Sequence, residues 1–292
     1  MIISHILGGL GNQMFQYAAG RTLALRRGDL LLLDSSDFSG YRLHQGFELA
    51  RVFTCAVELA TPVDMREVLG WRSSRHIRRL LSQPKMRFLR GRYFIVEPNF
   101  HYWPAINAVP QQCYLRGYWQ SDRYFADEVE TIRADFTFQQ PLSGRNSELA
   151  QAIGMVNAVS LHVRRGDYAN NPYTTATHGV CPLAYYKAAI RYIAERVEAP
   201  HYFVFSDDME WVRANLRIQF PCSYVDHNHG AESYNDMRLM SLCKHHIIAN
   251  SSFSWWGAWL NSCEDKMVIA PRKWFANEND TKDLLPIGWF TL

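Results

Sequence analysis

The stretch AVSLHVRRGDYAN, residues 158–170, runs from an apolar segment directly into two adjacent arginines, a glycine and an aspartate. The apolar part has the length and β-branched content of a buried strand. Two neighbouring guanidinium groups repel each other, so Arg164 and Arg165 are expected where solvent or an anionic group lies between them. The stretch therefore predicts a strand whose carboxyl end presents two cations at the rim of a sheet.

From residue 158 onward, apolar segments alternate regularly with helical patterns. Strands are predicted at AVSLHV, HYFVFS, CSYVDH, HHIIAN and KMVIAP, and helices at about 182–198, 208–217, 231–244 and 253–262. Such alternation predicts a parallel, doubly wound α/β sheet, in which ligands bind beyond the carboxyl ends of the strands. The segments that follow the strands, RRGDY, DDME, NHG, SSFSWW and RKW, are therefore expected along one edge.

The N-terminal segment predicts a second α/β unit. MIISHIL, the loop GGLGNQ, a helical pattern up to residue 27 and LLLLD together predict a strand, a helix and a strand. Residues 35–157 are rich in aromatic residues and interrupted by prolines, so only a mixed α/β character is predicted there. A chain of 292 residues is long enough for two domains, which we place at 1–150 and 151–292.

Composition narrows the class of protein. With 48% hydrophobic and 20% charged residues the chain is globular, and a net charge of +3 is too small to demand a nucleic-acid partner. Its six cysteines show no metal-ligand spacing, which predicts free thiols in a reducing compartment. No signal-like N-terminus and no run of about 18 apolar residues is present, so a cytoplasmic location is expected.

The arginine pair is the first candidate site. Each planar guanidinium can bind phosphate oxygens with two donors, and a diphosphate has enough oxygens for both Arg164 and Arg165. The pair therefore predicts a pyrophosphate site, the alternative being an ordinary solvated surface pair. Asp167 is expected to orient an arginine, with general base as its second interpretation.

NSSFSWWGAWL, which begins at Asn250, is a second anion-binding signal. Serines at a strand-to-helix junction present hydroxyls beside the unpaired N–H groups of the first helical turn. Ser251, Ser252 and Ser254 are therefore predicted to contact the same phosphates. The alternative is that one of them only caps the helix. The three tryptophans of this segment are expected in the core.

Two aspartates follow the second strand of this region. Asp207 is predicted to accept the paired N–H donors of a guanine edge, and Asp208 to place a negative charge at a helix N-terminus. Two carboxylates could instead hold magnesium. Because two arginines are available to neutralise a diphosphate, no metal is expected.

The glycine-rich loop near the N-terminus supports a competing interpretation. Gly8, Gly9 and Gly11 allow the backbone to approach a ligand closely, and Asp34 ends the next strand. A NAD-dependent oxidoreductase would use such a βαβ unit, although the third glycine of its GxGxxG pattern is missing. This oxidoreductase is the alternative function.

Residues 71–92, WRSSRHIRRLLSQPKMRFLRGR, contain eight of the 31 basic residues and no acidic one. Ile77, Leu80 and Leu81 are predicted on one helical face, so the segment could make peripheral contact with an anionic membrane at its inner face. The alternative is a solvated basic helix.

Three motifs, GGLGNQMFQYA, HVRRGDY and ANSSFSWWGAWL, resemble in order and spacing those of the bacterial α-1,2-fucosyltransferases of glycosyltransferase family 11, nearly end to end. The resemblance implies a GT-B fold of two Rossmann-like, doubly wound domains facing a cleft. Its C-terminal domain would hold GDP-β-L-fucose, and its N-terminal domain chiefly the acceptor. It also implies inverting, metal-independent transfer of fucose to the 2-hydroxyl of a galactose, in an oligosaccharide or a lipid-linked glycan of the O-antigen type.

The resemblance also assigns residues. It places the donor's diphosphate at HVRRGD, with Arg165 and Arg164 as catalytic residues. It does not settle the general base, for which Asp167 is the one acid of these motifs that stands out. It implies that the loop with Gly11 reaches the donor from the other domain. The implied donor-binding set is His162, Arg164, Arg165, Asp207, Asn250, Ser251, Ser252, Phe253, Ser254, Gly9, Gly11 and Asn12.

Overall fold

The structure is a computed structural model that describes residues 1–40, 45–276 and 279–292, apart from the side chains of residues 167, 170, 172 and 173. The chain forms two compact units. Unit 1 comprises Met1–Gln139 with Asp280–Leu284, and unit 2 comprises Gln140–Asn279 with Leu285–Leu292. The division thus precedes helix α6 (Gly144–Gly154), whereas the boundary at 150/151 lies inside that helix.

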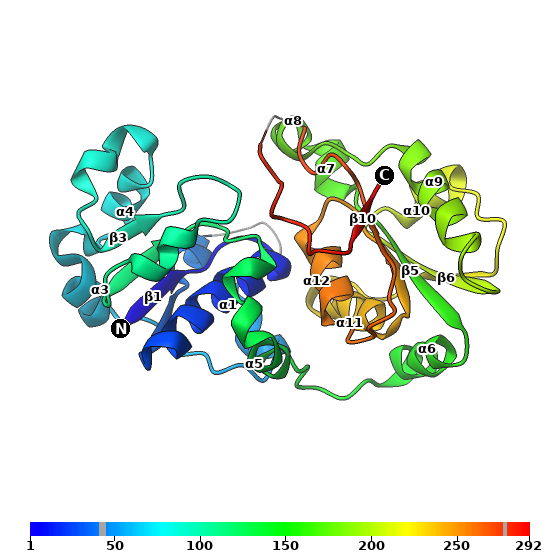
Figure 1. Ribbon diagram of the computed structural model, residues 1–292, viewed down its shortest axis with the longest axis horizontal. Coiled ribbons are helices and arrows are strands. Elements are labelled where there is room, and N and C mark those ends of the chain that lie inside the picture. Colours follow the sequence, from blue (N-terminus) through cyan, green and yellow to red (C-terminus); the bar gives the residue numbers. More distant parts are fainter. Residues whose placement is uncertain (41–44, 277–278) are drawn as a thin grey trace. The chain divides into compact units, whose positions relative to one another are not determined.

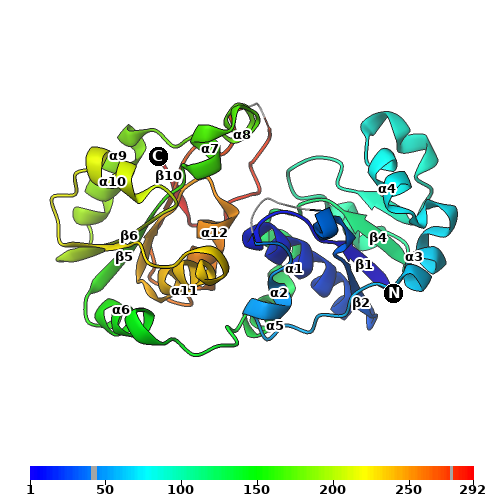
Figure 2. The ribbon, with the colours of Figure 1, turned by 180° about the vertical axis from the view of Figure 1, so that it is seen from behind.

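Unit 1 is built on a four-stranded sheet. Strands β1 (Ile2–His5), β2 (Leu31–Asp34), β3 (Phe94–Val96) and β4 (Cys113–Arg116) pair in the order β2-β1-β4-β3, and every pairing is parallel. Helix α1 (Leu10–Arg27) joins β1 to β2 and packs against the sheet (Figures 1 and 2). The predicted βαβ unit is therefore confirmed.

The rest of unit 1 consists of short elements that its prolines start or interrupt. The α-helices are α2 (Leu49–Val52), α3 (Pro62–Leu69), α4 (Arg75–Leu81) and α5 (Val129–Asp135). The 3-10 turns are η1 (Ser36–Gly40), η2 (Gly70–Ser73), η3 (Pro84–Leu89), η4 (Pro104–Ala108), η5 (Asp122–Tyr124) and η6 (Ala126–Glu128). Helix α3 begins with a capping box between Thr61 and Asp64, which satisfies its first N–H groups.

Helix α4 differs from its prediction in one respect. Leu81 is buried in the core beside β1 and β4, and Ile77 packs against that core. Leu80, expected on the same face, is 44% exposed. The buried side of the helix is formed by Ile77, Arg78 and Leu81, so Leu80 lies outside it and faces solvent.

Unit 2 is built on a six-stranded sheet. Strands β5 (Asn157–Val163), β6 (Pro200–Ser206), β7 (Cys222–Val225), β8 (His245–Ile247), β9 (Val268–Ala270) and β10 (Phe290–Thr291) include all five predicted strands. Their order is β10-β9-β8-β5-β6-β7, with parallel pairing throughout. In chain order this is the 3-2-1-4-5-6 arrangement of dinucleotide-binding domains, whose ligands bind where the order reverses. That switch point lies between β5 and β8.

Helices cover both faces of this sheet. They are α6, α7 (Gly166–Asn170), α8 (Pro172–His178), α9 (Leu183–Ala194), α10 (Met209–Asn215), α11 (Tyr234–Leu242) and α12 (Ser252–Leu260), with the turn η7 (Gly230–Glu232). Leu161 and Val163 of β5 face a core with α9 and α10, while Ala158 faces a second core with α6 and α11. The doubly wound prediction is confirmed. The three tryptophans of α12 are buried, as predicted.

All six cysteines are free thiols, as the sequence predicted. Burial raises the pKa of Cys113 and of Cys181 to about 11, so both stay protonated at neutral pH and are poor nucleophiles. Across the described ranges, each helix is too short or too polar to cross a lipid bilayer.

Candidate active site

Two of the sequence motifs meet at the switch point of unit 2. The loop that begins at Arg164 follows β5, and residues 248–251 follow β8, which pairs with β5. The rings of His162, near the end of β5, and Phe253, in the first turn of α12, lie with centroids 6.0 Å apart. The predicted diphosphate-binding segments therefore share the edge at which such sheets bind their ligands.

Asp207 holds the arginine loop from the end of β6. Its Oδ1 accepts the backbone N–H of Arg165 at 2.8 Å, and its Oδ2 pairs with Nη1 of Arg164 at 3.0 Å. A Cβ on Gly166 would come within 2.5 Å of the same Oδ2, so a side chain there would displace the carboxylate that holds the loop. Both oxygens of the predicted guanine acceptor are thus engaged inside the protein.

Asp208 and Trp211 position the second arginine. Nε of Arg165 donates to Oδ2 of Asp208 at 3.3 Å, and its guanidinium lies 3.8 Å above the centre of the Trp211 ring. The other oxygen of Asp208 accepts the N–H of Trp211 at 3.2 Å and caps α10, which confirms the predicted helix N-terminal position. Arg164 and Arg165 are 23% and 21% exposed, so each is a partly buried, paired cation.

The first turn of α12 presents N–H groups that have no partner within the helix. Ser251 occupies the N-cap position, but its hydroxyl makes no capping bond, and the first helical bond runs from Trp255 N–H to its carbonyl at 3.0 Å. The hydroxyl of Ser254 is buried and bonds back to the carbonyls of Ala249 and Ser251. Ser251 and Ser252 therefore have the hydroxyls best placed for an anion, while that of Ser254 is used within the turn.

Asn250 ties three loops together. Its side chain is 2% exposed, and its Nδ2 donates to the carbonyls of His178 at 2.9 Å and Trp274 at 3.1 Å. Its Oδ1 accepts from the thiol of Cys181 at 3.3 Å. Asn250 was predicted to contact the donor. In the structure its side chain bonds to neighbouring loops and supports this edge of the sheet.

His162 is neutral at physiological pH. Its side chain is buried, and burial lowers its pKa to about 4 despite the nearby charge of Asp207. In the described part of the chain its Nδ1 has no hydrogen-bond partner. A neutral imidazole can hydrogen-bond a ligand but adds no positive charge. The side chain of Asp167, predicted to orient an arginine or else to act as a base, lies outside the described residues.

The glycine-rich loop of unit 1 is fixed by its own residues. Gly8 has a φ of +90°, and a Cβ there would lie 2.7 Å from Nδ2 of Asn12. Oδ1 of Asn12 accepts from Nε2 of Gln120 at 2.7 Å, which ties the first turn of α1 to the loop after β4. Gly9 is the N-cap residue of α1, and Gly11 is buried in its first turn. This loop lies at the carboxyl end of β1.

The carboxylate of Asp34 is engaged within unit 1 and does not face a site where it could bind the ribose of a dinucleotide. It is 4% exposed, pairs with Arg78 at 3.1 Å and accepts the hydroxyl of Tyr114 at 2.7 Å. The coulombic pull of Arg78 keeps its pKa low against the opposing effect of burial. The acidic residue on which the oxidoreductase alternative depended is therefore an internal ion-pair partner.

Sequence patterns missed a second polar edge at the carboxyl ends of the unit 1 strands. Nε2 of His5 lies 2.9 Å from Oδ2 of Asp37, whose other oxygen accepts from Nε of Arg75 at 2.7 Å. The hydrogen bond with His5 lowers the pKa of Asp37 most, against the effect of burial. The carboxylate of Glu97, just after β3, accepts two backbone N–H groups of the loop after β4. Such an edge could bind sugar hydroxyls, but no sequence spacing links these residues.

A third polar cluster follows β7, where sequence patterns indicate only the segment NHG. Asn228 donates to Oδ1 of Asp236 at 2.7 Å and exchanges hydrogen bonds with Asn146 of α6 at 2.8 and 3.0 Å. Burial raises the pKa of Asp236 to about 7. The cluster joins α6, the loop after β7 and α11 through an acid that titrates near neutrality.

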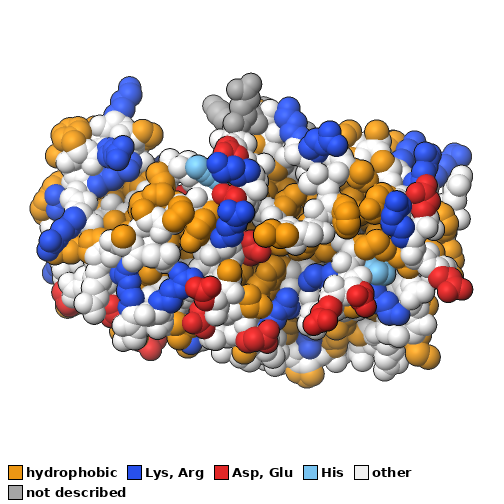
Figure 3. All heavy atoms as spheres, in the orientation of Figure 1, with side chains coloured by type: hydrophobic (Ala, Val, Ile, Leu, Met, Phe, Trp, Pro, Cys, Tyr) orange, Lys and Arg blue, Asp and Glu red, His pale blue; other side chains and the backbone are white. Residues whose placement is uncertain are grey.

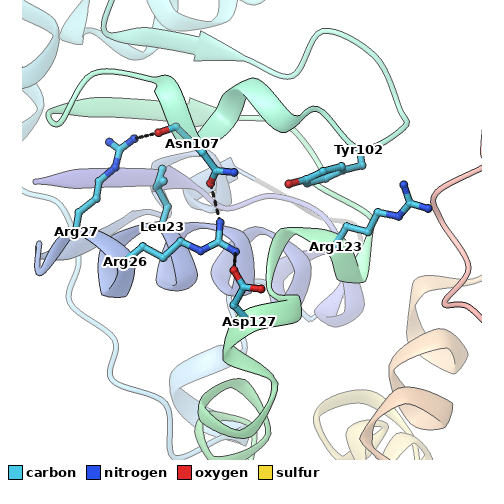
Figure 4. Close-up of a pocket in the computed structure, with 7 residues that line it drawn as sticks. All are labelled: Leu23, Arg26, Arg27, Tyr102, Asn107, Arg123 and Asp127. Atoms are coloured by element: carbon cyan, nitrogen blue, oxygen red, sulfur yellow. Dashed lines mark hydrogen bonds and ion pairs between the residues drawn. The ribbon is translucent and has the colours of Figure 1, made fainter.

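One pocket of about 400 Å³ lies on unit 1 (Figure 4). Arg26 and Arg27 of α1 point into it, but Arg26 is held by Asn107 and Asp127, and Arg27 by backbone carbonyls. Arg123 pairs with Asp283 at 2.8 Å. The predicted site residues do not line this pocket. Arg26 joins α1 to η4 and η6 through Asn107 and Asp127.

Comparison with known proteins gives end-to-end matches. The model of glycosyl transferase family 11 matches residues 4–292. The chain is 36% identical to an alpha-1,2-colitosyltransferase of Escherichia coli, over 99% of this chain and 98% of that one. It is 38% identical to the O-antigen biosynthesis glycosyltransferase WbnK of Escherichia coli, over 99% of both chains.

A solved structure supports the fold. Fucosyltransferase NodZ from Bradyrhizobium matches with a TM-score of 0.55 and 16% identity, over 88% of this chain and 91% of that one. A crystal of NodZ, an alpha-1,6-fucosyltransferase, soaked with GDP-fucose matches with the same TM-score, 14% identity, and 89% and 91% coverage. The shared fold is the GT-B type that the motifs predicted. With a family match across residues 4–292, the chain is a glycosyltransferase that belongs to glycosyl transferase family 11.

Proposed function

We propose that this enzyme transfers L-fucose from GDP-β-L-fucose to the 2-hydroxyl of a galactose, in an oligosaccharide or a lipid-linked glycan. Unit 2 would hold the donor, and unit 1 chiefly the acceptor. The observation that carries the proposal is the arginine pair at the switch point of unit 2, where Asp207 and Asp208 fix Arg164 and Arg165. The family's fucosyl- and colitosyltransferase relatives support the class of donor.

The donor's diphosphate would replace the carboxylates as partner of the two guanidiniums. Each arginine has more N–H donors than its present aspartate accepts, and a diphosphate supplies oxygens to both. The N–H groups at the start of α12 and the hydroxyls of Ser251 and Ser252 would complete the anion site. Asp207, released from Arg164, would then accept the N–H groups of the guanine edge, as its position after β6 predicts.

The chemistry follows from where charge develops. As the bond between fucose C1 and the phosphate oxygen breaks, negative charge grows on the β-phosphate and positive charge on the sugar ring. Guanidiniums fixed beside that oxygen stabilise the transition state more than the ground state. The acceptor oxygen attacks C1 from the face opposite the leaving GDP, which inverts the β-linked donor to an α-linked product. Its proton would pass to a base, for which Asp167 is the sequence-based candidate.

We further propose that no metal is required. A divalent cation in such a reaction neutralises the leaving diphosphate, and here two arginines and a helix N-terminus would supply that positive potential. Transfer in the presence of EDTA at the same rate as without it tests this part directly.

Colitose is the second candidate donor sugar, because a relative aligned over 99% of this chain is a colitosyltransferase. Colitose is L-fucose without its 3-hydroxyl, so both sugars present the same anomeric carbon to the same diphosphate site. A site that hydrogen-bonds the 3-hydroxyl would reject colitose strongly, whereas an apolar site would discriminate little.

The deciding experiment offers GDP-fucose and the colitose donor, each in EDTA, with a panel of galactose-terminated oligosaccharides. We expect an α-1,2-linked fucosyl product, identified by NMR of the purified glycan. GDP should raise the melting temperature in EDTA, and NAD should not, because only a ligand of the folded state stabilises it. A product formed only from the colitose donor would replace the proposed sugar, and protection by NAD without protection by GDP would reject the nucleotide.

A further inference from the structure

The segment of unit 1 that comprises η2, α4 and η3 carries apolar side chains that face solvent. Phe88 is 79% exposed and Trp71 is 58% exposed, and Leu80 and Leu89 are also exposed. They come from η2, α4 and η3, which pack against one another. Scattered exposed hydrophobic residues need no explanation, but four within one small substructure, two of them aromatic, indicate a binding surface.

The same segment also carries exposed cations. Arg79, Lys85 and Arg87 are exposed, and none of them forms an ion pair with any residue that the structure describes. No acidic residue occurs between positions 71 and 92. Figure 3 shows basic and hydrophobic side chains interleaved over this end of unit 1, around α4. We call the four apolar residues and these three cations the α4 patch.

The patch is a fixed surface. Nε of Arg72 donates to the carbonyl of Leu89 at 2.7 Å, which joins η2 to η3. Nε of Arg90 donates to the carbonyl of Leu81 at 2.7 Å, which joins η3 to the end of α4. Because Leu81 is itself buried in the core, the exposed side chains stand on a base anchored to the sheet.

Two other basic residues of α4 form ion pairs within unit 1. Arg78 is 5% exposed and pairs with Asp34, and Arg75 pairs with Asp37. The sequence alternative of a uniformly solvated basic helix is therefore wrong for Arg78. Arg75 and Arg78 thus hold the carboxyl ends of β1 and β2, whereas Arg79 faces solvent and belongs to the patch.

We propose that the α4 patch docks unit 1 on an anionic membrane surface. Interleaved aromatic, aliphatic and cationic side chains match the interface of a bilayer, where apolar groups enter the headgroup region and cations meet lipid phosphates. A duplex nucleic acid would contact the cations through its phosphates, but its stacked bases would leave Phe88 and Leu80 in water. Charge complementarity together with the exposed apolar side chains therefore selects an anionic lipid surface as the occupant.

Docking through α4 would also place the polar edge of unit 1 close to the lipid. The same helix holds Asp34 and Asp37 at that edge through Arg78 and Arg75. An acceptor glycan carried by a lipid would then meet the edge without leaving the membrane surface. This consequence rests on the proposed acceptor, whereas the docking itself does not.

Sedimentation with vesicles tests the docking. The intact protein is mixed with vesicles of phosphatidylcholine that contain about one third phosphatidylglycerol, and with phosphatidylcholine alone. We expect binding to the anionic vesicles that weakens with salt. A triple variant, Arg79→Gln, Lys85→Gln and Arg87→Gln, should partition about 10²-fold more weakly, since each cation contributes about fivefold. Phe88→Ser should weaken partitioning about tenfold.

Matched controls change the same residue types elsewhere. Lys187, Arg191 and Arg217 are exposed cations of unit 2, and their triple exchange for glutamine lowers the net charge equally. Ile287→Ser removes an apolar side chain that is 95% exposed in unit 2. Both controls should bind vesicles as the wild type does, and melting curves should show that every variant folds.

Three outcomes would overturn the proposal. The first is equal loss of binding in the two triple variants, which would indicate a general charge effect. The second is binding that Phe88→Ser does not weaken. The third is a dimer, seen by light scattering, that Phe88→Ser dissociates, since the patch would then contact a second copy of the chain. Because no readout depends on sugar transfer, failure here leaves the proposed function untouched.

Discussion

Replacing Arg165 with alanine should lower turnover without unfolding the protein. Loss of one preorganised donor at a developing oxyanion costs about 3 to 4 kcal/mol, which corresponds to a fall in kcat of about 10² to 10³. The guanidinium lies 3.8 Å above Trp211 and 3.3 Å from Asp208. Because Asp208 is 30% exposed, it stays hydrated in the variant, and the free energy of unfolding should change by less than about 1 kcal/mol.

The assay is the initial rate of sugar transfer at varied donor and acceptor concentrations, which separates kcat from KM. Arg165→Lys keeps the charge but loses the planar fork and the stacking on Trp211, so it should fall between the wild type and the alanine variant. Arg213→Ala is the matched control, because Arg213 also pairs with an aspartate, at 2.7 Å, and lies 4.3 Å above a tyrosine ring. It projects from α10 near the edge strand β7 and should keep normal kinetics.

Two results would refute the reasoning. If the Arg165→Ala variant kept kcat within about threefold of the wild type, the guanidinium would not stabilise the transition state. If Arg213→Ala lost as much activity as Arg165→Ala, the effect would come from a general loss of arginine stacking. A rise in KM for the donor at constant kcat would assign Arg165 to ground-state binding alone.

Three further substitutions test other parts of the structure. Gly166→Ala would place a Cβ 2.5 Å from Oδ2 of Asp207 and displace the arginine loop. Calorimetry should therefore show that GDP binds about tenfold more weakly. An unchanged affinity for GDP would contradict this prediction. Burial raises the pKa of Asp236 from 3.8 to about 7, so the folded state binds this proton more tightly than the unfolded state and stability should fall as the pH rises from about 4 to about 7. Asp236→Asn should reduce that fall in urea unfolding, and a parallel decline in both proteins would contradict the assignment. Arg78→Ala should lower the free energy of unfolding by about 3 to 5 kcal/mol, because it removes the ion-pair partner of a buried carboxylate. The control Arg79→Ala changes an exposed residue and should alter the free energy of unfolding by less than about 0.5 kcal/mol. Equal effects of the two substitutions would show that the buried pair is not important for stability.

The sequence predicted unit 2 well because each of its elements carries its own signal. Apolar strands such as β5 and β6 are seven residues long, and α9 has a clear helical spacing of buried residues. Parallel alternation alone brings the carboxyl ends of the strands to one edge, so the arginine and serine segments could be placed together without knowing the strand order. The order 3-2-1-4-5-6, which puts them at adjacent strands, came only from the structure.

Unit 1 could not be predicted in detail because its signals are short and its partners are distant. Strand β3 has three residues and β4 has four, and β4 is fixed by pairing with β1, far away in the sequence. His5 and Asp37 are 32 residues apart and belong to different elements. The roles of Asp207 and Asn250 were also beyond sequence patterns, since these depend on which neighbours their polar atoms meet.

Asp207 and Asp208 bear on how the catalytic cycle ends. Under the proposed mechanism, spent GDP leaves two guanidiniums that the carboxylates, 3.0 and 3.3 Å away in this structure, can reclaim at once. Departure of the product is then an exchange of one anion for another, and bare cations are never exposed to each other. An enzyme built in this way carries an internal competitor for its own by-product, which favours rapid release and limits product inhibition.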